Sequence, residues 1–258
     1  MDRTQETARI LFDDWNAKTP YRAMSGANAI RSVEEAYLVQ SELQKLHAKT
    51  RGRIAGRKIA LASKAMQQMV GMDRPIAAAM FADDVVMSPA TIRAGDFVRL
   101  GLEFELAVEL NADIPPQATA HSARTAQGFV ASVRPAFELI EDRKADYAAL
   151  DPHTIIADNG WCGGVVLGTP LANWAELDLG DIPSTVSQAG EPDEETNTGA
   201  ADPLASLAWV LNHFSERGIT LSKGEHIITG SAVRTRFPVP GDSFTYTVAG
   251  ATVQVSVI

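Results

Sequence analysis

Apolar residues recur at helical spacing in two segments within the first fifty positions. The apolar positions of the first segment are Ala8, Leu11, Phe12 and Trp15. Thr4 precedes this stripe by one turn, where it can cap a helix. The second segment follows Ser32, which forms a capping-box pattern with Glu35. Its apolar positions are Ala36, Val39, Leu43 and Leu46. We therefore predict a small N-terminal helical region over residues 1–53.

From residue 54 to residue 258 the pattern changes to short apolar segments separated by Gly, Pro, Asp and Asn. This pattern predicts strands and turns, without the regular alternation of strands and helices of a Rossmann or barrel fold. One helix is expected here, capped by Asp202, with Pro203 in its first turn and an end before Gly218. The polar residues 188–198 predict a solvated turn. The predicted fold class is α+β, with a β-rich domain over residues 54–258.

The composition is that of a globular protein. Of the 258 residues, 45% are hydrophobic and 21% are charged, and no apolar run approaches the roughly 18 residues of a membrane span. The sequence is charged from Asp2 onward and lacks the pattern of a secretory signal. The single cysteine, Cys162, cannot form an intramolecular disulfide. We therefore expect a cytoplasmic protein with no membrane contact.

Charge and motifs exclude several classes of function. The net charge of −9 has the wrong sign for a protein that binds nucleic acid by neutralising phosphates. The sequence contains no P-loop, no HExxH motif and no GxSxG motif. The histidines are dispersed and lack the spacing of a zinc site; they are His47, His121, His153, His213 and His226. The candidates for chemistry are therefore carboxylates.

Two carboxylates lie two residues apart in the segment GLEFELAVEL, residues 101–110. In a strand, Glu103 and Glu105 project from the same face. Two adjacent carboxylates repel each other unless they are solvated, protonated or bridged by a cation, and Mg²⁺ or Mn²⁺ prefers carboxylate oxygens. An ordinary strand with one solvent-facing side has the same spacing. The segment by itself leaves both interpretations open.

A third carboxylate, Glu138, interrupts an apolar run at residues 133–140. An unpaired buried carboxylate is energetically costly, so Glu138 needs a partner. Either Arg134 or Arg143 could form an ion pair with it. The alternative partner is a cation that Glu138 shares with the two carboxylates of residues 103 and 105.

Six short motifs occur in the order found in one enzyme family. They are Gly56-Arg57-Lys58-Ile59, Phe81-Ala82-Asp83, Glu103-Phe104-Glu105, Pro135-Ala136-Phe137-Glu138, Ala157-Asp158-Asn159 and Thr229-Gly230-Ser231. Together they resemble the 2-oxopent-4-enoate hydratase and 4-oxalocrotonate decarboxylase group of the fumarylacetoacetate hydrolase superfamily. The match spans nearly the whole chain, and the ordered set is specific. The resemblance implies an α+β fold in which a small helical region precedes a β-rich roll around a metal site.

The resemblance also implies roles for individual residues. The positions that match ligands of Mg²⁺ or Mn²⁺ are Glu103, Glu105 and Glu138. Lys58 and Asp83 match active-site positions, and we expect them to manage proton transfer. The positions that match the turn holding the substrate carboxylate are Thr229, Gly230 and Ser231.

The activity that the resemblance implies is hydration of a 2-hydroxy-2,4-dienoate, of the 2-oxopent-4-enoate type, to a 4-hydroxy-2-oxo acid in aromatic catabolism. One alternative is decarboxylation of a 4-oxalocrotonate-like dicarboxylate, whose second carboxylate Arg234 or Arg236 could contact. Another is a non-catalytic partner subunit of a hydratase–decarboxylase complex, although the retained glutamates and Lys58 favour catalysis. The family leads us to expect a homo-oligomer and allows a complex with a pathway decarboxylase or aldolase.

Trp161 departs from the family pattern, because hydratases commonly have a serine at this position. An indole N–H donates a hydrogen bond but cannot relay a proton as a hydroxyl can. The neighbouring Gly160, Gly163 and Gly164 allow the backbone to bend closely around a site. We therefore expect Trp161 to line and reshape the substrate pocket. The alternative is a core tryptophan that points away from the metal.

Overall fold

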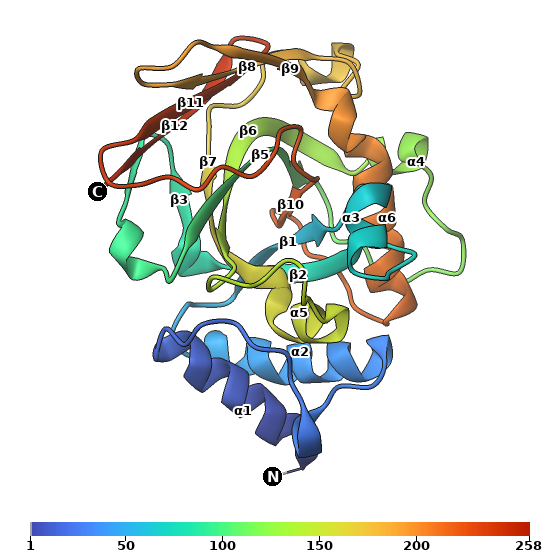
Figure 1. Ribbon diagram of the computed structural model, residues 1–258. Helices are drawn as coiled ribbons and strands as arrows, with labels where there is room; N and C mark the ends of the chain where they lie inside the picture. Colours follow the sequence, from blue (N-terminus) through green and yellow to red (C-terminus); the bar gives the residue numbers. More distant parts are fainter. Residues whose placement is uncertain (1) are drawn as a thin grey trace.

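Two β-sheets and a set of helices make up the computed structural model, which describes residues 2–258 (Figure 1). The α-helices are α1 (Arg3–Asn16), α2 (Val33–His47), α3 (Lys64–Met69), α4 (Ala123–Gln127), α5 (Pro152–Ala157) and α6 (Pro203–Glu216). The strands are β1 (Ile54–Ala60), β2 (Ile76–Phe81), β3 (Val85–Met87), β4 (Ala90–Ile92), β5 (Leu100–Leu110), β6 (Val130–Glu141), β7 (Cys162–Leu167), β8 (Pro183–Gln188), β9 (Glu194–Asn197), β10 (His226–Ile228), β11 (Ser243–Val248) and β12 (Ala251–Val257). The predicted α+β fold class is confirmed.

The seven-stranded sheet has the strand order β2-β1-β10-β5-β6-β7-β3. Its longest strands, β5 and β6, pair antiparallel from end to end. The sheet curls, so that β2 at one edge also contacts β7 near the other edge. The order places β10, and the turn that follows it, between β1 and β5. Segments far apart in the sequence therefore meet on the concave side of one sheet.

The five-stranded sheet, in the order β4-β12-β11-β8-β9, packs against β6 and β7 of the larger sheet. Burial alternates along β11 and β12, as expected for strands with one face toward the core. The side chains of α6 that pack against the same core are Leu207, Val210, Leu211 and Phe214. Asp202 caps α6 as predicted, since its carboxylate accepts a hydrogen bond from Ala205 N at 3.4 Å. No helix of residues 2–258 is both long enough and apolar enough to cross a bilayer.

The first helix begins two residues earlier than its apolar stripe suggested. Asp2 is the N-cap of α1, and its carboxylate accepts a hydrogen bond from Gln5 N at 2.9 Å. The Gln5 side chain accepts from Asp2 N in return, which completes a capping box. The predicted cap at Thr4 is therefore wrong, because Thr4 lies inside the first turn.

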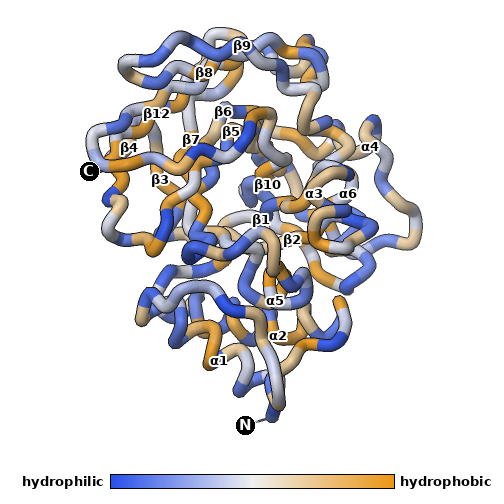
Figure 2. The backbone as a smooth tube through the Cα atoms, viewed as in Figure 1, coloured by the Kyte–Doolittle hydropathy of each residue, from blue (hydrophilic) through white to orange (hydrophobic). Residues whose placement is uncertain are grey.

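The second helix begins where the sequence predicts. Ser32 Oγ accepts a hydrogen bond from Glu35 N at 3.1 Å and caps α2. The reciprocal half of the predicted capping box is absent, because the Glu35 carboxylate accepts from Arg31 N at 2.8 Å and pairs with Arg3. Glu35 therefore connects the two helices, and both alternate between hydrophilic and hydrophobic stretches along their length (Figure 2).

Helices α1 and α2 pack beside α5, below the larger sheet in Figure 1. The connection from α2 to β1 spans the predicted boundary at residue 53. Buried residues from both sides of this boundary form one cluster, which includes Leu11, Leu43, Ile76, Ile156 and Trp161. The helices thus cover one face of the β-rich body, and their description as a separate domain stays a prediction.

Residues 188–198, expected to be a solvated turn, form the end of a β-hairpin, in which the turn at residues 189–193 is exposed as expected and residues 194–197 form a strand. Strands β8 and β9 pair antiparallel on either side of a short turn. Glu194 on β9 forms an ion pair with Arg236. Charged side chains suit such an edge strand, because they discourage pairing with another chain.

His47, the last residue of α2, is 2% exposed and is surrounded by the aromatic rings of Phe12, Trp15 and Phe81. Burial, reinforced by the positive charge of Arg51, lowers the pKa of His47 to about 3. The unfolded chain has an ordinary histidine pKa near 6.5. Between these two values the unfolded chain binds the proton and the folded protein does not.

We therefore expect the free energy of unfolding to be highest above pH 6.5 and to fall as the pH decreases toward 3, by up to about 1.4 kcal/mol per pH unit for this one group. The variant His47→Phe should flatten this dependence, because it removes the proton-binding group of the unfolded chain. Urea unfolding of both proteins between pH 7 and pH 4.5 measures the two slopes. Equal pH dependence of the free energy of unfolding in the two proteins would show that His47 is not the responsible group.

Candidate metal centre

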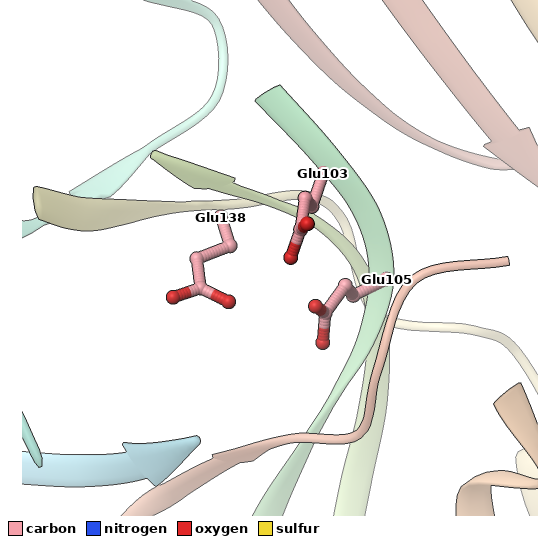
Figure 3. A group of neighbouring side chains, drawn as sticks. All are labelled: Glu103, Glu105 and Glu138. Carbon is pink, nitrogen blue, oxygen red and sulfur yellow. The ribbon is translucent and has the colours of Figure 1, made fainter. Parts of the chain in front are cut away.

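Three glutamates from two neighbouring strands point into the same space (Figure 3). Glu103 and Glu105 lie on β5, and Glu138 lies on β6. The antiparallel register pairs Glu103 directly with Glu138, and Glu105 is two residues further along the same face. One carboxylate oxygen of each residue lies within 4.8 Å of the other two. The structure thus brings together the three carboxylates that the sequence singled out.

Burial makes this cluster unfavourable without a cation. Glu105 is 1% exposed and Glu138 is 0% exposed. Burial and the nearby charges of Glu138 and Glu103 raise the pKa of Glu105 well above its usual value. Burial also raises the pKa of Glu138, although Lys58 acts in the opposite direction. Within residues 2–258, Glu105 Oε1 has no hydrogen-bond partner. A hard divalent cation fits this oxygen-only set.

Two hydrogen bonds fix the orientation of the carboxylates on β5. Thr235 Oγ1 donates to Glu103 Oε1 at 2.7 Å, and Gly230 N donates to Glu105 Oε2 at 2.6 Å. Each bond occupies one carboxylate oxygen and leaves the other for a cation. Such supporting bonds are typical of metal sites, where they orient the ligands.

The partner of Glu138 is a lysine. Lys58 Nζ on β1 lies 2.5 Å from Glu138 Oε1, and both side chains are almost completely buried. The arginines considered from the sequence are engaged elsewhere, because Arg143 pairs with Asp158 and Arg134 donates to a backbone carbonyl. Burial by itself would lower the pKa of Lys58, but the charge of Glu138 outweighs it and the pKa is raised.

A cavity of about 700 Å³ opens beside the glutamates. Its lining residues include Glu103, Glu105, Gly230, Ser231 and Thr235. Apolar side chains from the segment after β1, from α3 and from residues 233–237 form much of the remaining wall. Glu103 and Glu105 therefore face a pocket large enough for a small organic acid, whereas Glu138 and Lys58 lie behind its lining residues.

The turn at residues 229–231 supports the cluster directly. Thr229 Oγ1 donates to a backbone carbonyl of β5 at 3.0 Å, and Ser231 Oγ accepts from a backbone amide of β5 at 2.9 Å. Gly230 has a φ of 101°, which favours glycine, and its N–H holds Glu105. The turn therefore positions β5 and its carboxylates. Its contact with a substrate carboxylate stays a prediction.

The two other predicted site residues lie outside the residues that line the cavity. Asp83 is exposed, in a short 3-10 turn after β2, and its backbone N–H donates to Arg51 O. Trp161 is 7% exposed and packs edge-on against Tyr21 and Tyr147 at ring-centroid distances of 5.3 and 6.2 Å. Tyr147 does line the cavity, so Trp161 contacts the pocket wall from behind. The roles of Asp83 and Trp161 stay predictions.

The backbone at Trp161 is unusual. Three consecutive residues, Asn159, Gly160 and Trp161, have φ values of 54°, 54° and 60°. The left-handed region is unfavourable for residues with a Cβ, and such strain often marks functional sites. A Cβ added to Gly160 would lie 3.3 Å from Lys58 Cε. This turn therefore closes tightly around the lysine that pairs with Glu138.

Sequence reasoning missed Thr235 and most of the apolar pocket wall. Thr235 has no motif, and it reaches Glu103 only because residues 233–237 fold back over the end of β5. Helix α3 spans only six residues, too few to produce a helical pattern. Its two methionines, Met66 and Met69, are three positions apart in a polar segment, and this spacing was the available signal.

No family model matches the chain. The chain is 30% identical over 243 residues to the 2-keto-4-pentenoate hydratase of Paraburkholderia xenovorans, covering 93% of this chain and 89% of the relative. It is 32% identical over 228 residues to the 2-oxo-hept-4-ene-1,7-dioate hydratase of Escherichia coli, covering 83% and 82%.

Among solved structures, the 4-oxalocrotonate decarboxylase from Pseudomonas putida G7, complexed with magnesium and adipate, is similar with a TM-score of 0.89. Sequence identity is 23%, and the similarity covers 100% of this chain and 99% of that one. At this identity the likeness establishes the fold. The sequence relatives extend over most of both chains at 30% identity or more. The chain therefore belongs to the 2-keto-4-pentenoate hydratase and 4-oxalocrotonate decarboxylase family of enzymes.

Proposed function

We propose that the protein is a divalent-metal-dependent hydratase that converts a 2-hydroxy-2,4-dienoate of the 2-oxopent-4-enoate type into a 4-hydroxy-2-oxo acid in aromatic catabolism. The observation that supports this most strongly is the cluster of Glu103, Glu105 and Glu138, of which the first two line a cavity of about 700 Å³. Relatives named as hydratases of this substrate type support the choice of reaction.

In the proposed site, the three glutamates hold Mg²⁺ or Mn²⁺, and Thr235 and Gly230 keep two of the carboxylates oriented. The cation, when bound, supplies positive charge that stabilises the enolate of a 2-oxo acid. The enol proton moves from the 2-oxygen to carbon 3 as the 2-oxo group forms, and water adds its hydroxyl to carbon 4 and its proton to carbon 5, so only water is consumed. Lys58 is a buried amine beside the cluster, and we assign it the movement of that proton.

Asp83 and the turn at Thr229, Gly230 and Ser231 also belong to this proposal. The part of Asp83 in proton transfer rests on its motif alone. For the turn, Gly230 and Ser231 line the cavity, which supports contact with the substrate carboxylate.

The main alternative is a decarboxylase of a 4-oxalocrotonate-like dicarboxylate. That reaction needs a contact for a second carboxylate, and the sequence offered Arg234 and Arg236. Arg236 pairs with Glu194 and is not one of the lining residues of the cavity, whereas Arg234 is exposed and does line it. The hydratase proposal is therefore favoured, with Arg234 as the residue on which the alternative depends.

The decisive experiment uses the isolated chain, stripped of metal and then supplied with Mg²⁺ or Mn²⁺. Loss of the ultraviolet absorbance of 2-hydroxypenta-2,4-dienoate, with 4-hydroxy-2-oxopentanoate as the product, is the expected result. Release of CO₂ from 4-oxalocrotonate without hydration would favour the decarboxylase. No turnover of either compound by a metal-loaded chain would favour a non-catalytic partner subunit.

Trp161 is proposed to shape the pocket through Tyr147. The variant Trp161→Ser removes the ring that supports Tyr147, so we expect kcat/KM for 2-hydroxypenta-2,4-dienoate to rise several-fold relative to a bulkier dienoate. We also expect stability to fall by about 3–5 kcal/mol, as is typical when a buried aromatic ring is removed. Steady-state kinetics with both substrates measures the ratio.

The control for Trp161 is Tyr21→Leu. Tyr21 packs on Trp161 but is not a lining residue of the cavity, so its loss should lower stability without changing the substrate ratio. If Trp161→Ser behaves like this control, Trp161 is a core residue and not a determinant of substrate choice.

We also propose that the protein works in the cytoplasm as a homo-oligomer, open to association with a decarboxylase or aldolase of the same pathway. The edge strand β3 exposes Val86 and Met87, and Ile258 is also exposed where the chain pairs with β4. Exposed apolar side chains at a sheet edge suit contact with a second copy of the chain. The mass of the purified protein in solution tests this, with Met87→Lys expected to weaken assembly.

A further inference from the structure

The outer part of the cavity is bordered by large apolar side chains that are open to solvent. Met66, Met69, Tyr147 and Phe237 all line it, with exposed fractions of 39%, 45%, 37% and 45%. We refer to these four residues as the apolar rim. Leaving such side chains in water is unfavourable, and a cluster of them around an opening is typical of a binding site.

The aromatic half of the apolar rim is held in place by an ion pair. The guanidinium of Arg99 lies 4.8 Å from the ring centre of Phe237 and 5.8 Å from that of Tyr147. Arg99 is fixed by Asp142, which also accepts a hydrogen bond from Tyr147 Oη at 3.1 Å. The two rings are therefore a prearranged surface, so a ligand that contacts them orders little additional structure.

The methionine half of the apolar rim comes from α3. Ser63 caps this helix, and the buried Gln67 donates to Leu61 O at 2.9 Å, which ties the helix to the loop after β1. With Gln67 directed inward, Met66 and Met69 remain at the surface of the cavity. Methionine is flexible and polarizable, so it adapts to apolar groups of different shape.

Little unpaired positive charge is available to a ligand in the same region, since Arg99 beside the apolar rim is paired with Asp142. Among residues 2–258, Arg234 is the single lysine or arginine that lines the cavity, and it is exposed. An ion pair with an exposed arginine contributes little to affinity, because water screens the two charges. Burying a phenyl-sized group against the apolar rim contributes more, because it removes a large apolar surface from water. The balance of these contributions favours an uncharged end group over a second carboxylate.

The size of the cavity agrees with this preference. A volume of about 700 Å³ lies within the range of roughly 300–1,000 Å³ in which proteins bury drug-sized ligands. The four side chains of the apolar rim are 37–45% exposed, so apolar surface is available beyond the carboxylates. A longer substrate would cover it.

We propose that the apolar rim selects 2-hydroxy-2,4-dienoates that bear a bulky, uncharged alkyl or aryl group on carbon 5. This inference rests on the proposed hydratase function and extends it to a substrate class. In the reaction, the enol proton moves from the 2-oxygen to carbon 3, water adds across the 4,5 double bond, and the apolar group remains attached to carbon 5. The tail lies against Met66, Met69, Tyr147 and Phe237 while the acid end lies at the glutamates.

Binding is tested separately from turnover with saturated 2-oxo acids, which cannot be hydrated. In calorimetry with the Mg²⁺-loaded protein, 2-oxo-5-phenylpentanoate should bind at least about tenfold more tightly than 2-oxopentanoate. The dicarboxylate 2-oxohexanedioate should bind no more tightly than 2-oxopentanoate. The double variant Met66→Ser/Phe237→Ser should reduce the tenfold preference to less than about threefold.

Leu38→Ser is the control, because Leu38 is an exposed apolar residue on α2 that does not line the cavity, and it should retain the full preference. Three results would each overturn the proposal. In the first, 2-oxo-5-phenylpentanoate binds no more tightly than 2-oxopentanoate. In the second, the protein's preference for the phenyl acid persists in the double variant. In the third, 2-oxohexanedioate binds most tightly and loses that advantage in Arg234→Gln.

A failure of the proposed hydratase function would give a different set of results from these three. In that case the 2-oxo acids bind in the expected order, but neither 2-hydroxypenta-2,4-dienoate nor 2-hydroxy-5-phenylpenta-2,4-dienoate is hydrated. The opposite result is efficient hydration of the unsubstituted dienoate with a kcat/KM for the phenyl compound that is lower by tenfold or more. That result would support the hydratase function and contradict the proposed preference for an apolar tail. Kinetics with both dienoates therefore distinguishes a failure of the hydratase function from a failure of the proposed substrate preference.

Discussion

Replacing Glu105 by glutamine is expected to weaken Mg²⁺ binding by at least about 100-fold and to abolish turnover at ordinary metal concentrations. Substitutions of residues that only orient metal ligands already cost about 10–100-fold, and Glu105 supplies an oxygen and a charge directly. Glutamine keeps the shape, and its amide oxygen can still accept the hydrogen bond from Gly230 N. The substitution should therefore weaken Mg²⁺ binding without disturbing the fold. Isothermal titration of metal-free protein measures it.

Thermal unfolding supplies a second readout for Glu105→Gln. Wild-type protein should gain about 2.7 kcal/mol of stability at a Mg²⁺ concentration one hundred times the dissociation constant, and the variant should gain almost none at that concentration. In chelator, the variant should unfold at the same or a higher temperature than wild type, because a carboxyl group has been removed from three mutually repelling carboxylates, two of which are buried.

Glu109→Gln is the control for the same strand. Glu109 lies further along β5, where Ser132 Oγ donates to it at 2.7 Å, and it is not part of the glutamate cluster. This variant should bind Mg²⁺ normally. Equal Mg²⁺ affinity in Glu105→Gln and wild type would rule out Glu105 as a ligand.

Replacing Lys58 by methionine is expected to lower kcat by about 10²–10⁴, the usual contribution of a general acid or base. Mg²⁺ affinity should stay the same or increase, because a positive charge beside Glu138 has been removed. A decrease in kcat without weaker metal binding is the pattern of a residue that moves a proton. Kinetics at saturating Mg²⁺ and a metal titration measure the two effects.

Stability gives an internal check on Lys58→Met. Breaking a buried ion pair costs about 3–5 kcal/mol because the remaining charge has no partner, so the metal-free variant should be markedly less stable than wild type. Mg²⁺ should restore most of this loss by compensating Glu138. Lys45→Met, at an exposed position on α2, is the control for loss of a lysine. An unchanged kcat across the pH range would remove Lys58 from the mechanism.

Several features of the molecule follow from local sequence patterns. The stripe of Leu207, Leu211 and Phe214 after Asp202 predicts α6, and the structure has this helix with that cap. Alternation along residues 101–110 places Glu103 and Glu105 on one face of a strand, as observed. These patterns suffice because the spacing of side chains along a helix or strand is fixed by the backbone alone.

Local patterns fail where a competing local partner is present. Thr4 looked like a helix cap, yet Asp2 caps α1 because Gln5 can return the hydrogen bond. Residues 188–198 looked like a solvated turn, yet part of them pairs as β9 against β8. In both cases the sequence contained the residues required, and the outcome depended on which of two hydrogen-bonding arrangements was more favourable.

The sequence by itself determined the helical N-terminal region, the β-rich body and, through its ordered motifs, the family. Only the tertiary structure decided the partner of Glu138. The register of β5 with β6 sets Glu138 opposite Glu103, and the strand order brings Lys58 from β1 to the same place. Register and strand order are set by the burial of whole sheet faces and by contacts between distant segments, which a local pattern does not contain. The apolar rim was decided in the same way, since α3, Tyr147 and Phe237 meet only when the chain is folded.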